Sequence, residues 1–248
     1  MPKISKRKAK LHLEACGILE QKTLSSEDRD FVYENWLPSY NNNTGWIAAF
    51  FTPIAMTYDF AMYTPDKGSV VDLAAGIGGL SRAMIDSNYI SGNPLELEIV
   101  CVERNKEFVE VGKKLVPEAR WIQADIFDQS VWEKLGHFNY AVSNPPFGQI
   151  GQAKDHWLKY NGVADLMTVS LALEIAKGST FILPQSSLPF KYSGQSSYQM
   201  NESKNFNNLR KAFPEMGCHC SSIDTSVYQK SWLDTCPAVE IVTFENMV

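Results

Sequence analysis

The 248-residue sequence lacks any hydrophobic run close to the roughly 20 apolar residues that a helix needs to cross a bilayer. Its basic first ten residues are followed by no apolar segment of the kind that forms a secretion signal. It has only five cysteines, and their irregular spacing does not indicate a disulfide framework. We therefore expect a protein of a reduced, intracellular compartment, most simply the cytoplasm, without a membrane partner.

An excess of positive charge is also absent. The formal net charge is -5 and the isoelectric point is near 5.4, whereas a domain that binds nucleic acid unaided usually has a basic surface. One dense basic cluster lies within residues 3–10, and it indicates either a solvated terminus or an arm that contacts phosphates. Support for a nucleic-acid substrate must therefore come from motifs.

Predicted strands and helices alternate from residue 69 onward. Strands are predicted over 70–73, 97–102, 120–123, 138–143, 180–183, 220–226 and 239–244, and helices over 80–87, 106–115, 164–176 and 203–213. This alternation predicts an α/β fold of the Rossmann-like, doubly wound type. We expect a mostly parallel seven-stranded sheet with an antiparallel C-terminal strand. Residues 1–48 are predicted to add an N-terminal helical extension.

Small residues follow the first strand of this predicted sheet. They are Asp72, Ala74, Gly76 and Gly78. Glycine lets the backbone turn sharply and approach a ligand without a Cβ in the way. Such a turn alone is weak evidence, because many strand-to-helix turns contain glycine for packing. Ser81 stands where the dinucleotide-binding fingerprint needs Gly or Ala, which disfavours a dehydrogenase.

Acidic residues follow the next two strands. Glu103 with Arg104 follows the second strand, and Asp125 with Ile126 follows the third. Ligands bind beyond the carboxyl ends of the strands in such sheets, so Glu103 could accept hydrogen bonds from ribose hydroxyls. Asp125 could accept one from an adenine amino group, with Ile126 or Phe127 against the ring. Each acid alone could equally be a solvated or capping residue at a helix start. Together with the glycine turn, they predict a nucleoside site.

The fourth predicted strand runs directly into Asn144-Pro145-Pro146-Phe147. Two prolines fix φ and remove two backbone donors, so the loop is stiff and presents carbonyl oxygens. The Asn144 side-chain oxygen and the Pro145 carbonyl can each accept one hydrogen of a ring-conjugated amino group, which exposes the nitrogen lone pair. Phe147 can stack on the ring, a contact worth about 1–3 kcal/mol per base. We predict that this is the catalytic loop, with a purely structural turn as the alternative.

The order of these motifs resembles that of the class I S-adenosylmethionine-dependent methyltransferases over about residues 69–248. The resemblance implies S-adenosyl-L-methionine as cofactor and residues 49–248 as the methyltransferase catalytic domain, without a clear separate target-recognition domain. It further implies that Asp72, Gly76 and Gly78 line the methionine part, that Glu103 holds the ribose and that Asp125 holds the adenine. No metal is implied, since the Cys218–Cys220 spacing is too short for a usual structural zinc site.

The Asn-Pro-Pro-Phe loop is similar to the signature of adenine-N6 methyltransferases, and variants occur in guanine-N2 RNA enzymes and glutamine-N5 protein enzymes. Phe51-Thr52-Pro53 resembles the upstream element of gamma-order adenine-N6 DNA methyltransferases, including the modification subunits of type I restriction systems. There the element closes over the methionine end of the cofactor. Here Ala48 and Ala49 replace the usual preceding Gly. A plain helix start with Pro53 in the first turn is the alternative.

These resemblances favour adenine N6 in DNA as the methyl acceptor. An amino group of RNA is the next hypothesis, followed by a protein glutamine and by a non-catalytic cofactor-binding subunit. A DNA-modifying enzyme usually carries a separate recognition domain, for which this chain has little room. We therefore also expect a partner subunit for target recognition, or a very short target sequence.

Overall fold

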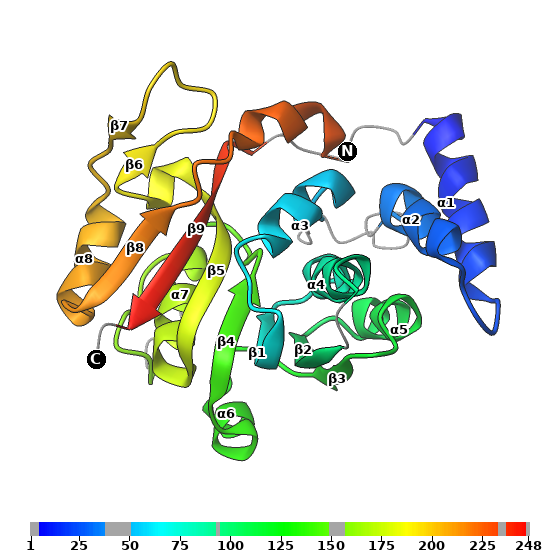
Figure 1. The fold of residues 1–248 in the computed structure, drawn as a ribbon, viewed down its shortest axis with the longest axis horizontal. Helices are drawn as coiled ribbons and strands as arrows, with labels where there is room; N and C mark the ends of the chain where they lie inside the picture. Colours follow the sequence, from blue (N-terminus) through cyan, green and yellow to red (C-terminus); the bar gives the residue numbers. More distant parts are fainter. Residues whose placement is uncertain (1–4, 38–50, 93–94, 149–156, 233–236, 247–248) are drawn as a thin grey trace.

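Seven strands of the computed structural model form one mixed sheet, flanked by helices on both faces (Figure 1). The structure describes residues 5–37, 51–92, 95–148, 157–232 and 237–246. The helices are α1 Lys6–Leu19, α2 Ser26–Asn35, α3 Ile54–Ala61, α4 Gly79–Ile90, α5 Lys106–Leu115, α6 Gln129–Leu135, α7 Ala164–Ile175 and α8 Lys204–Ala212, with two 3₁₀ helices at η1 Gln185–Ser187 and η2 Thr225–Ser231. The strands are β1 Lys67–Leu73, β2 Glu96–Glu103, β3 Arg120–Gln123, β4 Phe138–Ser143, β5 Ala176–Pro184, β6 Phe190–Lys191, β7 Gln199–Met200, β8 Met216–Cys220 and β9 Val239–Asn246.

The strand order in the large sheet is β3-β2-β1-β4-β5-β9-β8. The first five strands in this order pair in parallel, and β9 is antiparallel to both β5 and β8. The predicted α/β doubly wound fold, with an antiparallel C-terminal strand, is confirmed. Strand order reverses between β1 and β4, and ligands of such folds bind beyond the carboxyl ends of the strands at this point.

Two hydrophobic clusters lie on opposite faces of the sheet, because successive side chains of a strand point to opposite sides. Val71 of β1 packs with α6, α7 and α8, whereas its neighbour Val70 packs with helices α1 to α5. Phe181 and Ile182 of β5 divide in the same way. Since both faces are covered, the ends of the strands are left as the place for a ligand.

The N-terminal helices pack on the same core as the rest of the chain. Ala15 and Leu19 of α1, with Val32 and Trp36 at α2, are buried in the cluster that also covers one face of the sheet. In Figure 1 these two blue helices lie beside α4 and α5. No helix within the described ranges is long and apolar enough to span a membrane.

The prediction of a strand over 220–226 is wrong. Strand β8 ends at Cys220, and a 3₁₀ helix begins at Thr225. Ser222 has a φ of 61°, which ends the extended conformation, and the Asp224 carboxylate accepts hydrogen bonds from the backbone N–H groups of Gly194 and Ser226. Asx-type bonding of this kind stabilises a turn in competition with a strand.

Helix α6 was not predicted from sequence. Its seven residues are too few to show a clear helical period, and tertiary contact holds it, since Trp132 is buried and its Nε1–H donates to the Ile126 carbonyl at 2.8 Å. Ala48 and Ala49, which precede the upstream element in the sequence, lie outside the described residues.

Candidate active site

A cavity of about 390 Å³, open to solvent, lies at the carboxyl end of β1. Its walls come from β1, the turn into α4, the start of the loop after β4, α2 and the segment before α3. The lining residues are Tyr33, Phe51, Thr52, Asp72, Ala74, Ala75, Gly76, Ile77, Gly79, Leu80 and Asn144. Six of them were predicted as site residues: Phe51, Thr52, Asp72, Ala74, Gly76 and Asn144. The cavity is therefore at the reversal of strand order, where a doubly wound sheet binds its ligand.

The glycine turn brings backbone to the cavity wall. Gly76 has a φ of 58°, and a Cβ built there would lie 3.2 Å from Cε1 of Phe51, so this position needs both left-handed backbone and space. Gly78 has a φ of 87°, and a Cβ there would lie 2.8 Å from Val116 and 2.9 Å from Trp121. Gly76 therefore borders the cavity, whereas Gly78 serves the packing of the turn against the core.

Glu103, at the end of β2, holds the glycine turn. Its Oε2 accepts a hydrogen bond from the Gly76 N–H at 2.9 Å, and its Oε1 accepts one from the Asn105 N–H at 2.7 Å. Burial raises the pKa of this carboxyl group, and the hydrogen bonds from backbone N–H groups act in the opposite direction. Glu103 thus stands directly behind the cavity wall, in contact with one of its lining residues.

Asp72, at the carboxyl end of β1, is buried and lines the cavity. Its Oδ2 accepts a hydrogen bond from the Ser81 hydroxyl at 2.7 Å, while its Oδ1 is buried and has no hydrogen-bond partner among the described residues. Burial raises the pKa of Asp72 from 3.8 to about 7. A buried carboxylate oxygen of this kind suits a ligand that brings a donor or a positive charge.

Asp125, Arg104 and Ile126 do not line the cavity. Asp125 Oδ1 accepts a hydrogen bond from the Phe127 N–H at 2.9 Å, and its Oδ2 lies 3.5 Å from Nη1 of the exposed Arg104. Ile126 is buried in the hydrophobic cluster that contains residues of α6, α7 and α8, whereas Phe127 is half-buried. Asp125 therefore follows the end of β3 as predicted, but in this structure its carboxylate caps a turn and does not face the cavity.

The loop after β4 brings Asn144 to the cavity and to the upstream element. Asn144 Nδ2 donates a hydrogen bond to Thr52 Oγ1 at 2.9 Å. Pro145 is buried and Pro146 is exposed. Phe147 is half-buried against the hydrophobic cluster that contains residues of α1 to α5. Pro53 is the N-cap residue of α3, which begins at Ile54. It therefore lies just before the first turn of the helix and not within it. The motifs around Thr52 and Asn144, 92 residues apart, thus meet at one point.

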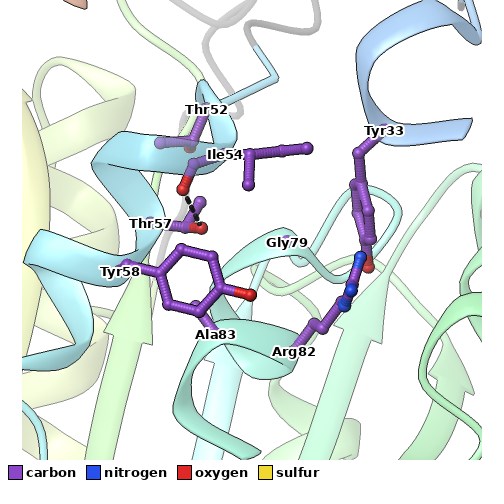
Figure 2. A pocket seen from close by; sticks show the side chains of 8 residues that line it. All are labelled: Tyr33, Thr52, Ile54, Thr57, Tyr58, Gly79, Arg82 and Ala83. Atoms are coloured by element: carbon purple, nitrogen blue, oxygen red, sulfur yellow. Dashed lines mark hydrogen bonds between the residues drawn. The ribbon is translucent and has the colours of Figure 1, made fainter. Parts of the chain in front are cut away.

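Some lining residues were not found from the sequence. Ala75, Ile77, Gly79 and Leu80 belong to the predicted glycine turn and could have been included with it. Tyr33 of α2 had no such signal, because it lies 34 residues before the start of β1 at Lys67, in a helix expected only to pack. A second cavity of about 240 Å³ lies next to the first and shares Tyr33, Thr52 and Gly79 with it (Figure 2).

Comparison with known protein families found one match, which covers more than half of the chain. A family model described as "Methyltransferase small domain" matches residues 60–191, which include β1, the glycine turn and the Asn144 loop. A search of curated protein sequences found no match.

Solved structures with similar folds have low sequence identity to the chain. One similar chain comes from a structure that describes the complex assembly of a type I restriction-modification system. Its TM-score is 0.61 at 14% identity, and the match covers 90% of this chain and 48% of that chain. A type I restriction-modification methyltransferase subunit from Streptococcus thermophilus has a TM-score of 0.57 at 14% identity, with 90% and 51% covered. A candidate RNA methyltransferase from Pyrococcus horikoshii has a TM-score of 0.51 at 16% identity, with 90% and 100% covered. The chain thus spans about half the length of the two type I proteins, and at these identities the likeness concerns the fold.

Proposed function

Because the chain belongs to the methyltransferase small domain family and is an S-adenosylmethionine-dependent methyltransferase, we propose that it methylates the exocyclic N6 amino group of adenine in DNA. The observation that supports this most is the hydrogen bond between Asn144 and Thr52 at the cavity. It joins the Asn-Pro-Pro-Phe loop to the Phe51-Thr52-Pro53 element, so the two motifs that favour adenine N6 stand in one site.

The cavity residues suit the cofactor. Asp72 offers a buried carboxylate oxygen without a partner among the described residues, which fits the amino group of a methionine moiety. We propose that Phe51, Thr52 and Gly76 hold the same moiety, and that Glu103 and Asp125 hold the ribose and the adenine. The bound cofactor supplies a methyl group that is already activated by a positively charged sulfur. The protein must therefore position and orient the acceptor rather than generate a strong nucleophile.

Asn144 and Pro145 are the groups that we propose to prepare the amino nitrogen. Thr52 binds the Nδ2 side of the Asn144 amide, which directs Oδ1 to the opposite side. Oδ1 and the Pro145 carbonyl each accept one amino hydrogen, and the nitrogen lone pair then points away from the ring plane. The nitrogen lone pair would form the new bond to the methyl carbon as the sulfur–carbon bond breaks and leaves its electron pair on the sulfur, and the nitrogen would release one proton to water. Orientation of this kind can supply roughly 7–11 kcal/mol of the barrier reduction.

The acceptor polymer is the finer part of the proposal. Phe51-Thr52-Pro53 favours DNA, because it resembles the element of the gamma-order DNA enzymes. The similar structures include proteins named for restriction-modification and one candidate RNA enzyme, so fold likeness does not separate the two acceptors. An RNA amino group is therefore the second candidate. We also propose a partner subunit that contributes target recognition, because the similar structures include proteins of type I restriction-modification systems that are named as a subunit or for complex assembly.

The test is transfer of a labelled methyl group from S-adenosylmethionine to separate pools of unmethylated duplex DNA, single-stranded DNA, ribosomal RNA and protein. We expect label in duplex DNA, and nucleoside analysis should identify it as N6-methyladenine. The Asn144→Ala variant is the control for contaminating enzymes. Label that prefers structured RNA in competition would select the RNA candidate, and label in glutamine would select a protein acceptor. If no DNA accepts label, the DNA proposal is wrong.

A further inference from the structure

We propose that helix α2 contributes to one wall of the methyl-donor site and that Tyr33 of α2 is a positioning residue for the glycine turn. This rests on the proposed assignment of the larger cavity to S-adenosylmethionine. Tyr33 lines both cavities, and its hydroxyl donates a hydrogen bond to the Ile77 carbonyl at 3.2 Å. Ile77 lies between Gly76 and Gly78, so the bond reaches the most constrained part of the turn.

Arg82 joins α2 to the first turns of α4. Its guanidinium lies over the Tyr33 ring, 5.4 Å from the ring centroid, and Figure 2 shows the two side chains next to each other across the smaller cavity from Tyr58. The side chain is buried, with Nη1 2.7 Å from Asp30 of α2 and Nε 3.1 Å from Asp86 of α4. A buried charge is costly unless it is paired, so these contacts hold α2 in one position against α4.

A second contact reaches the larger cavity, at Phe51. Trp36, directly after α2, packs against Phe51 with ring centroids 6.0 Å apart and against Phe108 of α5 at 5.8 Å. Phe51 in turn lies against Gly76. The segment from Tyr33 to Trp36 therefore supports the cavity at two lining residues, Ile77 and Phe51.

This arrangement couples cofactor binding to the docking of α2. A ligand that needs the ordered glycine turn must also favour the docked helix, and by linkage the docked helix must favour the ligand. The hydroxyl of Tyr33 supplies the direct link, while its ring and Arg82 hold the helix in place. Removal of the hydroxyl alone should then affect donor affinity more than the chemical step.

The first experiment compares Tyr33→Phe with Tyr63→Phe. Both variants lose one tyrosine hydroxyl that donates to a backbone carbonyl, but the Tyr63 hydroxyl donates to Ser221, which is not a lining residue of either cavity. We expect Tyr33→Phe to raise the KM and Kd for S-adenosylmethionine about two- to tenfold, the range for one net hydrogen bond, with kcat at saturating donor unchanged. Tyr63→Phe should leave both constants unchanged.

A merely structural role predicts something different. In that case both variants would lower the melting temperature by similar amounts, and neither would change donor affinity. That result would overturn the inference. Glu103→Gln serves as the control for the assignment of the larger cavity to the methyl donor. If Glu103→Gln weakens donor binding and Tyr33→Phe does not, only the role of Tyr33 is rejected. Unchanged donor affinity in both Glu103→Gln and Asp72→Asn would instead reject the assignment of the cavity.

The second experiment needs no variant. Hydrogen exchange of the wild-type protein is measured with and without S-adenosylmethionine, and peptides from α2 are compared with peptides from α8. We expect the donor to slow exchange in α2 as well as in the glycine turn, and to leave α8 unchanged, since α8 lies on the other face of the sheet. Protection of the glycine turn without protection of α2 would contradict the coupling.

Discussion

Asn144 Nδ2 donates a hydrogen bond to Thr52 Oγ1 at 2.9 Å, across a separation of 92 residues in the chain. Both residues line the cavity at the end of β1. The bond gives the Asn144 amide a defined orientation, which its proposed role as acceptor of one amino hydrogen requires. It also joins the segment of Phe51 and Thr52, which lies ahead of the first strand, to the loop after β4 at the cavity.

Replacement of Thr52 by valine should impair the chemical step. Valine keeps the shape of threonine and removes the hydroxyl, so the Asn144 amide loses the partner that sets its orientation. We expect kcat to fall roughly 10- to 100-fold, as expected for a small misplacement of a positioning group. Thr64→Val is the matched control, because its hydroxyl bonds only to the Ala61 carbonyl among the described contacts. Equal losses in both variants would argue against this role of Thr52.

Replacement of Asn144 by alanine should separate binding from catalysis. We expect methyl transfer to fall by at least about 100-fold, in the range for loss of a preorganised hydrogen-bonding group. Affinity for S-adenosylmethionine should change little, as measured by isothermal titration calorimetry. If transfer persists at the wild-type rate, Asn144 has no part in the reaction and the loop is a structural turn.

Replacement of Glu103 by glutamine should weaken the donor site. The Glu103 carboxylate accepts hydrogen bonds from the N–H groups of Gly76 and Asn105, and one amide oxygen of glutamine cannot replace both acceptors. We expect the Kd for S-adenosylmethionine to rise about 10- to 100-fold, as for loss of a charged hydrogen bond. Glu98→Gln, an exposed change on the same strand, is the control and should bind as the wild type does.

The stability of the protein should depend on the protonation of Asp72. Because burial raises its pKa from 3.8 to about 7, the folded protein favours the protonated form. The resulting contribution to the free energy of unfolding is present below about pH 4 and is lost as the pH rises to about 7. Asp72→Asn lacks this titration, so its melting temperature should rise relative to that of the wild type between about pH 4 and about pH 7. A difference that stays constant over this range would contradict the prediction.

Gly78 should tolerate a methyl group less well than Gly92 does. Both have positive φ, 87° and 70°, so alanine costs roughly 1–2 kcal/mol of backbone energy at either position. At Gly78 the added Cβ would also approach Val116 and Trp121 within 3 Å, while at Gly92 no atom of the described residues, its chain neighbours aside, lies within 4 Å. We expect Gly78→Ala to lower the free energy of unfolding by about 1–3 kcal/mol more than Gly92→Ala, measured by urea denaturation. Equal losses of unfolding free energy in the two variants would show that Val116 and Trp121 move to accommodate the added methyl group.

The sequence by itself determined the fold class, most of its elements and the residue types at the strand ends. Helix α5 and strands β3 and β4 have the bounds predicted from periodicity, because their hydrophobic patterns depend on neighbours three, four or two residues away. The strand predicted over 220–226 failed where hydrogen bonds to the Asp224 side chain, including one from Gly194, favoured a turn. The roles of Glu103 and Asp125 toward a cofactor stay predictions.

Only the tertiary structure decided which of these residues meet. Thr52 with Asn144, Gly76 with Glu103 and Tyr33 with Ile77 are joined across 92, 27 and 44 positions, and no local period encodes such pairs. They form because the order of strands in the sheet brings the carboxyl ends of β1, β2 and β4 to one edge, and because a buried arginine holds α2 against α4. The Asn-Pro-Pro-Phe loop is therefore readable from the sequence, whereas the donor-site wall made by Tyr33 is not.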